Sequence, residues 1–222
     1  MTTTPGTPDG VPPDPRPRGR LVACRRVGQG GGVPAVRMLV IADTHVPKRA
    51  RDLPAAVWAA VDAADVVVHA GDWVDVGLLD VLDARARRLV GVAGNNDGPE
   101  LRARLPEVAR TDVGGLALAV VHETGEARRR EERCDADPRF AGAGVLVFGH
   151  SHVPWDTTTP RGLRLLNPGS PTDRRRMPAC TYLTATVTDG LLGDVELHPL
   201  PVRRPGPSST AARRSSSTRR PS

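Results

Sequence analysis

The stretch VRMLVIADTH, residues 36–45, decides the fold class, because an apolar run of strand length leads directly into an aspartate and a histidine. Such a run is typical of a strand that is buried on both faces. The same pattern recurs at residues 65–70 and 89–93. Helical patterns separate these strands at residues 54–64 and 76–87. Strands that alternate with helices predict an α/β fold with parallel strands.

The second half of the chain is richer in strands. A short helix is expected at residues 99–105, and a charged helix at 126–134. Short β-branched or apolar runs predict strands at 116–121, 145–148, 163–166, 180–187 and 192–197. Because turns rather than helices separate the last of these strands, we expect mixed sheets in this half.

The positive charge of this protein lies in its two tails. The net charge is +6, but residues 1–37 carry +4 and residues 203–222 carry +6, so residues 38–202 carry −4. Both tails are rich in Pro, Gly, Ser or Thr and contain too little apolar surface to offset the entropy of ordering. We therefore predict a disordered extension at 1–36, one domain at 37–202 and a disordered basic tail at 203–222.

The composition excludes several classes of protein. No apolar run approaches the roughly 18 residues of a membrane-spanning helix, and no secretory leader is visible, so we expect no membrane partner. The three cysteines are odd in number and widely spaced, which disfavours a disulfide framework or a cysteine metal site and favours a reducing cytoplasm. The glycine-rich loops of nucleotide-binding enzymes are absent from the sequence.

Polar residues of a few types follow five of the expected strands at their carboxyl ends. Ligands bind at this edge of α/β sheets, so we expect these side chains to meet in one crevice. Carboxylate, imidazole and amide groups bind Mn, Fe, Zn or Ni, and seven of them suit two ions that share a bridging carboxylate. The seven candidate ligands are Asp43, His45, Asp72, Asn95, His122, His150 and His152.

The order of these motifs resembles that of the calcineurin-like metallophosphoesterases, especially the small, cap-less phosphodiesterases of bacteria and archaea. The resemblance covers residues 38–199 and rests on DTH (43–45), GD (71–72), GNND (94–97), His122, GHSH (149–152) and NPGS (167–170). It implies a four-layer α-β-β-α sandwich with two mixed sheets. It also implies that Mn²⁺ is the favoured metal. By resemblance, the first ion is held by Asp43, His45, Asp72 and His152, and the second by Asp72, Asn95, His122 and His150.

Two further residues of the GNND motif are predicted to take part in catalysis. By resemblance, Asp97 orients its neighbours in the loop. Asn96 stands where many members of the family have a histidine that contacts the substrate and protonates the leaving group. An amide cannot act as a general acid, and losing such an acid costs about 10²–10⁴ in rate. We therefore expect a preference for diesters or activated esters.

Other residues near the motifs have more than one interpretation. Glu123 replaces the glycine that usually follows the ligand at 122, and its carboxylate either crowds the phosphate or points to solvent. His69 is expected to be structural, because core residues precede it. Trp73 is expected to pack in the core, with the rim of the pocket as the alternative. Asn167 is expected to form a turn, with a border of the site formed by residues 167–170 as the alternative.

The function predicted from the sequence is hydrolysis of phosphate esters, with phosphodiesters favoured, by a metal-bound hydroxide acting on a small phosphorylated substrate. The first alternative is a non-catalytic, protein-binding scaffold of the same fold, like the subunit of the retromer coat. Retention of all seven ligands favours the enzyme. The second alternative is a nuclease that holds nucleic acid with its basic tails, which we do not favour because the body of the chain is acidic.

Overall fold

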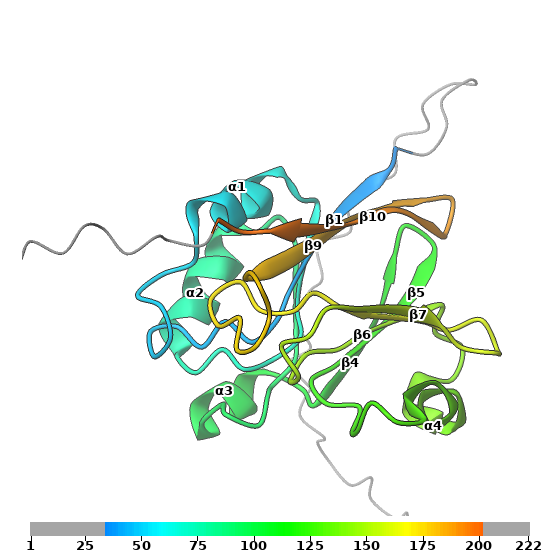
Figure 1. Ribbon diagram of the computed structural model, residues 1–222. Helices are drawn as coiled ribbons and strands as arrows, with labels where there is room; N and C mark the ends of the chain where they lie inside the picture. The colour runs from blue at the N-terminus through cyan, green and yellow to red at the C-terminus, as the bar shows by residue number, and fades with distance from the viewer. Residues whose placement is uncertain (1–33, 202–222) are drawn as a thin grey trace, which may run out of the picture. The chain divides into compact units, whose positions relative to one another are not determined.

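The computed structural model describes residues 34–201 and folds them into two five-stranded sheets packed face to face (Figure 1). β1 begins at Val36, close to the predicted start of the domain. The disorder predicted for the tails concerns residues that, apart from 34–36, lie outside this range.

The first sheet contains the three parallel strands that the sequence predicts. β1 pairs with β2 in parallel, and β2 with β3, whereas β9 runs antiparallel to both β1 and β10. The strand order is β10 (Leu191–Pro199), β9 (Thr181–Thr188), β1 (Val36–Ile41), β2 (Val66–His69) and β3 (Leu89–Gly91). The predicted mixture of parallel and antiparallel strands is therefore confirmed.

The second sheet has three parallel strands between two antiparallel edges. β5, β6 and β8 are parallel, and β4 and β7 pair antiparallel at the two edges. The order is β4 (Val108–Val113), β5 (Leu116–Val121), β6 (Val145–Val147), β8 (Arg164–Asn167) and β7 (Trp155–Thr158). The sequence interpretation missed β4 and β7, in which exposed residues alternate with more buried ones over most of the strand, as expected for edge strands.

Helices cover the outer face of each sheet and complete four layers (Figure 1). α1 (Ala55–Ala63), α2 (Val76–Arg85) and α3 (Pro99–Arg104) lie with the first sheet. α4 (Arg130–Ala136) and a 3₁₀ turn, Pro138–Phe140, lie with the second. The predicted α-β-β-α sandwich is confirmed. Among the helices of residues 34–201, none has the length and apolar character of a membrane span.

The apolar run of β1 is explained by burial on both of its faces. Met38 and Val40 pack into the core between the two sheets, whereas Leu39 and Ile41 pack against the helices. All four side chains are almost fully buried. Removing each of them from water stabilises the folded state by about 1.5–3 kcal/mol. A strand with alternating polar residues could not occupy this position.

α4 begins four residues later than the sequence predicts. The guanidinium group of Arg133 donates hydrogen bonds to the carbonyl oxygens of Arg128, Thr124 and Glu126. These carbonyls are satisfied without a helix, so the preceding segment stays irregular until the left-handed residue Arg129. The spacing of residues in the sequence does not show that one arginine side chain will bind the carbonyls of the preceding loop.

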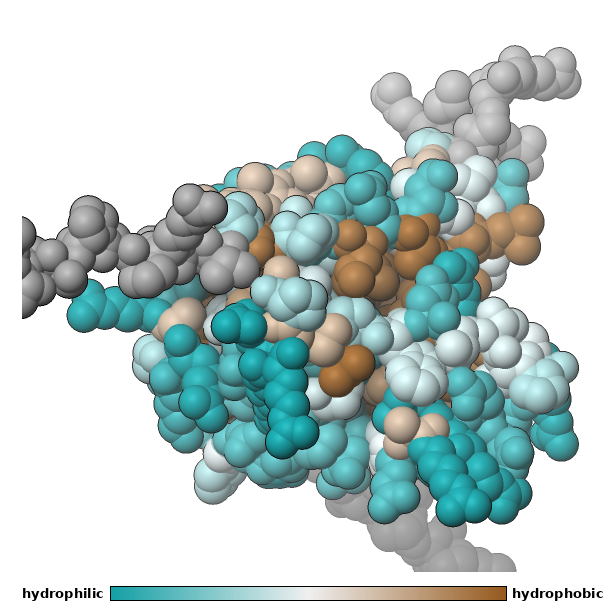
Figure 2. All heavy atoms as spheres, viewed as in Figure 1, coloured by the Kyte–Doolittle hydropathy of each residue, from teal (hydrophilic) through white to brown (hydrophobic). Residues whose placement is uncertain are grey.

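Exposed hydrophobic residues lie on the edge strand β10, and hydrophobic surface gathers over the β9–β10 hairpin in Figure 2. Leu191 and Leu197 are the exposed leucines of this strand. Its pairing with β9 shifts between Gly193 and Glu196, and the exposed acidic residue Asp194 lies within the shift. Irregular register and negative charge both disfavour the addition of another strand to an edge.

Candidate metal centre

The predicted ligands lie at the carboxyl ends of strands from both sheets. Asp43 and His45 follow β1, Asp72 follows β2, and Asn95 follows β3. His122 follows β5, and the GHSH loop follows β6. The crevice therefore lies where the ends of two facing sheets meet, and not along one open sheet. The strand-end rule still places all seven residues together, because the ends of β1–β3 and of β5–β6 face the same side.

Hydrogen bonds between loops fix these ligands relative to one another. The amides of Asp43 and His45 donate to the carbonyls of Gly71 and Asp72, each at 3.0 Å. The amide of His150 donates to Oδ1 of Asp43 at 3.1 Å, which joins the two sheets. The site is therefore held by main-chain contacts and not only by side-chain rotamers.

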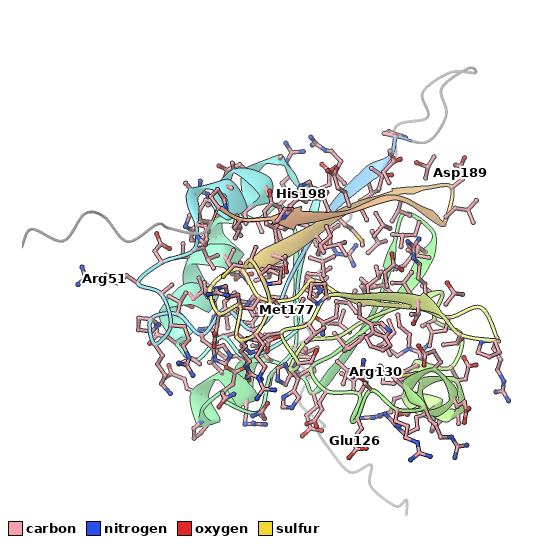
Figure 3. The ribbon with its side chains drawn as sticks, viewed as in Figure 1. Arg51, Glu126, Arg130, Met177, Asp189 and His198 are labelled. Carbon is pink, nitrogen blue, oxygen red and sulfur yellow. The ribbon has the colours of Figure 1, made fainter. Side chains whose placement is uncertain are left out.

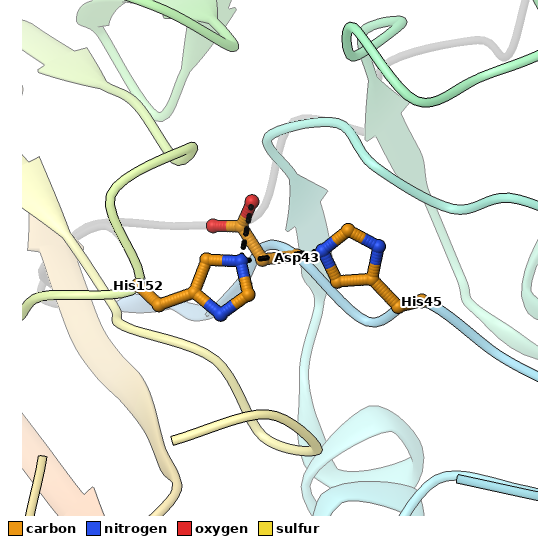
Figure 4. A group of neighbouring side chains, drawn as sticks. All are labelled: Asp43, His45 and His152. Atoms are coloured by element: carbon orange, nitrogen blue, oxygen red, sulfur yellow. Dashed lines mark hydrogen bonds and ion pairs between the residues drawn. The ribbon is translucent and has the colours of Figure 1, made fainter. Parts of the chain in front are cut away.

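The first group of ligands is Asp43, His45 and His152, shown in Figure 4. The Nε2 atoms of His45 and His152 are 3.2 Å apart. Nε2 of His152 lies 3.6 Å from Oδ1 of Asp43, and Nε2 of His45 lies 3.5 Å from Oδ2 of Asp72. These four atoms thus face a common point, as the resemblance implies for the first ion.

The second group gathers around the amide oxygen of Asn95. Oδ1 of Asn95 lies 2.9 Å from Nε2 of His122 and 2.9 Å from Nδ1 of His150. Nε2 of His122 is in turn 3.4 Å from Oδ1 of Asp72. This arrangement brings together the four residues that the resemblance implies for a second ion.

Asp72 has the geometry of a bridging ligand, because its Oδ2 faces His45 and its Oδ1 faces His122. The fit to cations is also visible at Asp43, whose buried Oδ2 has no hydrogen-bond partner among the described residues. Burial, and then the charge of Asp72, raise the pKa of Asp43 well above its usual value. Two buried carboxylates this close suit a site that holds positive charge. The donor set fits two divalent ions.

The backbone at the site is strained in a way that supports a functional role. Asp43, His45, Asp72, His150 and His152 all have positive φ angles, between 44° and 70°. A residue other than glycine adopts this region at a cost of about 1 kcal/mol or more, and such residues cluster at functional sites. Five of the seven predicted ligands share this feature.

Two glycines leave room for the ligands. A Cβ atom on Gly71, which has a φ of +87°, would lie 2.7 Å from Nδ1 of His122. A Cβ atom on Gly94 would lie 2.9 Å from Cα of Asp72. The glycines that precede Asp72 and Asn95 therefore permit the close approach of the loops that carry the ligands.

Asp97 holds the loop that carries Asp72. Its buried carboxylate accepts hydrogen bonds from the amides of Asp72, Val74 and Gly94, at 3.2, 2.7 and 2.7 Å. The predicted orienting role agrees with these contacts, which reach main-chain atoms and not the centre of the site. We therefore describe Asp97 as a positioning residue.

Asn96 contacts the bridging carboxylate. Its Nδ2 donates to Oδ2 of Asp72 at 2.6 Å, and its amide donates to Oδ1 at 2.8 Å. Burial acts to raise the pKa of Asp72, but His122 and these hydrogen bonds hold it below its usual value. Contact between Asn96 and a substrate stays a prediction.

Several residues support the ligands in ways that the motifs did not indicate. The buried side chain of Asn167 donates to the carbonyl of Gly149 at 2.8 Å and so holds the GHSH loop. Ser170 donates to the carbonyl of Asp43 at 2.7 Å. The NPGS motif placed these residues near the site but did not indicate which atoms they contact.

His69 and Trp73 are structural, as expected. His69 is fully buried, its Nε2 lies 3.0 Å from Oγ1 of Thr44, and its ring stacks on Trp73 with centroids 3.5 Å apart. Burial lowers the pKa of His69 well below its usual value, so the ring is neutral. Trp73 is itself buried and donates to the carbonyl of Val92, so it is not at the rim of a pocket.

A cavity of about 500 Å³ opens beside the second group of ligands. Its lining residues include Asn95, His122, Arg102 and Arg133. Glu123 stands at this cavity, with Oε1 3.9 Å from Nε2 of His150. The side chain is 54% exposed, in keeping with the alternative that points to solvent, and its carboxylate also lies near a ligand.

Comparison with known proteins gives consistent matches. A model of the calcineurin-like phosphoesterase superfamily domain matches residues 36–190. A probable metallophosphoesterase of Methanocaldococcus jannaschii is 36% identical over 153 residues, which cover 68% of this chain and 76% of that protein. A solution structure of a Thermotoga maritima protein is 30% identical with a TM-score of 0.59, and the match covers 74% of this chain and 99% of that one.

The same fold occurs in vacuolar protein sorting proteins. Vps29 of Entamoeba histolytica, solved as a complex with Zn²⁺, is 22% identical with a TM-score of 0.59. The match covers 74% of this chain and 98% of that one. At this identity the likeness concerns the fold alone.

Proposed function

Because this chain belongs to the calcineurin-like phosphoesterase superfamily, we propose that it hydrolyses phosphodiesters at a centre of two divalent metal ions. One observation carries the proposal: the two carboxylate oxygens of Asp72 face two separate groups of ligands. A bridging carboxylate between two ions is the arrangement that phosphoryl-transfer centres use.

The geometry supports the division of roles that the resemblance implies. Asp43, His45, Asp72 and His152 would hold one ion, and Asp72, Asn95, His122 and His150 the other. Ions bound there supply an activated water at neutral pH and neutralise the charge on the phosphoryl oxygens. Asp97 keeps Asp72 between the two groups through main-chain hydrogen bonds.

The preference for diesters rests on Asn96. Its side chain holds Asp72 and carries no proton that it can give to a leaving group. Hydrolysis of an alkyl monoester by such a site would be slow, whereas an activated ester or a diester with a good leaving group needs less help from an acid. We infer a small phosphodiester as the substrate class.

The ligand set favours metals that accept both nitrogen and oxygen donors. Four imidazole, two carboxylate and one amide group suit Mn, Fe, Zn or Ni, and we propose Mn²⁺ as the working metal. Location in the cytoplasm stays a prediction. Cys134 and Cys180 are both free thiols.

A protein-binding scaffold is the second candidate, because Vps29 shares the fold. Metal binding alone does not separate the two candidates, since one Vps29 was itself solved with Zn²⁺. Turnover does separate them.

The test is hydrolysis of bis(p-nitrophenyl) phosphate and p-nitrophenyl phosphate by the metal-stripped full chain, with and without Mn²⁺. We expect Mn²⁺ to restore activity, with the diester preferred, and Asp72→Asn to abolish it. Asp83→Asn, on the exposed face of α2, is the control and keeps wild-type activity. A folded protein that turns over neither ester with any divalent metal would favour the scaffold.

Two variants refine the test. Asn96→His restores a general acid, so turnover of an alkyl monoester should rise by about 10-fold or more, and no gain would contradict the explanation of the diester preference. Deletion of residues 203–222 should leave activity unchanged. Loss of activity with that deletion would favour the nuclease instead.

A further inference from the structure

In two of the predicted histidine ligands, one ring nitrogen faces away from the centre and contacts a main-chain carbonyl. Nδ1 of His122 lies 2.8 Å from the carbonyl oxygen of Ala70, and Nδ1 of His152 lies 2.7 Å from that of Asp173. A carbonyl can only accept, so each Nδ1 carries the proton and each Nε2 is free to bind an ion. Such partners fix the tautomer and the orientation of the ring.

His150 is turned the other way. Its Nδ1 faces Oδ1 of Asn95 at 2.9 Å, and its Nε2 points away from the centre toward Oε1 of Glu123 at 3.9 Å. The residue opposite its outer nitrogen is therefore a carboxylate and not a main-chain carbonyl. At 3.9 Å the two atoms are too far apart for a hydrogen bond, but the negative charge favours the tautomer with the proton on Nε2 and the lone pair on Nδ1.

The main chain places Glu123 next to His150. The amide of Gly149 donates to the carbonyl of His122 at 3.0 Å, which joins the end of β5 to the GHSH loop. Glu123 and His150 are the residues that follow this hydrogen-bonded pair in the two segments. Their proximity is thus set by the backbone, although both side chains are partly exposed.

We propose that Glu123 is a positioning residue for His150: its negative charge keeps the proton on Nε2 and directs Nδ1 toward the second ion. The inference rests on the proposed metal centre. Replacement of such an outer partner typically weakens metal binding by about 10–100-fold, and the exposure of this pair points to the lower end, about 10-fold. The first ion, which does not use His150, should be unaffected.

The test measures binding of Mn²⁺ to the metal-stripped full chain by calorimetry, with Glu123→Gln as the variant. The amide keeps the shape of the side chain but removes its charge. The matched control is Glu126→Gln, which removes the same charge three residues away. Glu126 is exposed and projects outward from the domain near α4 (Figure 3). We expect about 10-fold weaker binding of the second ion in Glu123→Gln and a change below about 2-fold in the control.

A double-mutant cycle shows whether Glu123 acts through His150. In a His150→Ala background, Glu123→Gln should cause no further loss of affinity. A loss that persists in this background would show that Glu123 attracts or binds the ion directly, and it would overturn the proposal.

The tautomer provides a readout that a general structural effect would not change. In the Zn²⁺-loaded protein, ¹⁵N spectra should show the His150 proton on Nε2 in the wild type and a smaller population of this form in Glu123→Gln. Equal populations and equal affinities would overturn the inference while two-ion binding still supports the proposed function. A wild-type protein that binds no second ion would overturn both.

Discussion

Replacing Gly94 with alanine tests whether the GNND loop sets the position of the bridging carboxylate. A Cβ atom at this position lies 2.9 Å from Cα of Asp72 and closer still to its amide nitrogen and Oδ1. One of the two loops must shift, at an overpacking cost of about 1–3 kcal/mol. For a domain of this size, that cost lowers the melting temperature by roughly 2–12 °C.

The same shift should weaken binding of both ions, because Asp72 serves both groups. A displacement energy of 1–3 kcal/mol corresponds to a loss of roughly 5–150-fold in affinity. The assay combines thermal unfolding followed by circular dichroism with calorimetric titration of Mn²⁺. Gly98→Ala is the control, since a Cβ atom there meets nothing within 4 Å. Wild-type stability and affinity in Gly94→Ala would show that the GNND loop does not set the position of Asp72.

Three further variants test the supporting contacts, each by urea unfolding. Asp97→Asn can place a side-chain NH₂ group opposite the backbone N–H of Asp72, so that two donors face each other. The change should lower the free energy of unfolding by about 2 kcal/mol, and an unchanged urea midpoint would contradict the positioning role. Asn167→Ala leaves the carbonyl of Gly149 without its donor and should cost about 1–3 kcal/mol. Hydrogen bonds from Arg37 hold the pKa of Asp65 at about 2. The contribution of Asp65 to the free energy of unfolding is therefore present above pH ~4 and is lost as the pH falls toward 2. Asp65→Asn should cost about 1 kcal/mol at pH 7 and much less at pH 2, where Asp65 is about half protonated.

The layers of the fold were predictable because burial leaves a clear pattern. β1 is buried on both faces, so its sequence is a continuous apolar run. β4 was missed because an edge strand needs few apolar residues, and its sequence VARTDV resembles a loop. The turn Gly114–Gly115, in which both residues have positive φ, was the available signal for a hairpin of β4 with β5.

The candidate site was predictable from position and residue type together. Each ligand follows a strand, and the topology brings the strand ends to one place. The contacts that hold the ligands were less visible, because they join main-chain atoms of one loop to side chains of another. Asn167 and Ser170 are examples, since neither side chain differs in type from an ordinary turn residue.

The environment of Glu123 shows a further limit of the sequence. The motif indicates only that a glycine is replaced beside a ligand. Whether the carboxylate faces the phosphate, the solvent or His150 depends on the pairing of β5 with the GHSH loop through the amide of Gly149. That pairing is a property of the fold.

The proposed metal centre requires Asp72 to bridge two metal ions. The most direct measurement is anomalous diffraction from crystals of the Mn²⁺-loaded protein, recorded on both sides of the manganese absorption edge. We expect two peaks roughly 3.5–4 Å apart, one beside each carboxylate oxygen of Asp72. A single peak, or peaks away from Asp72, would contradict it.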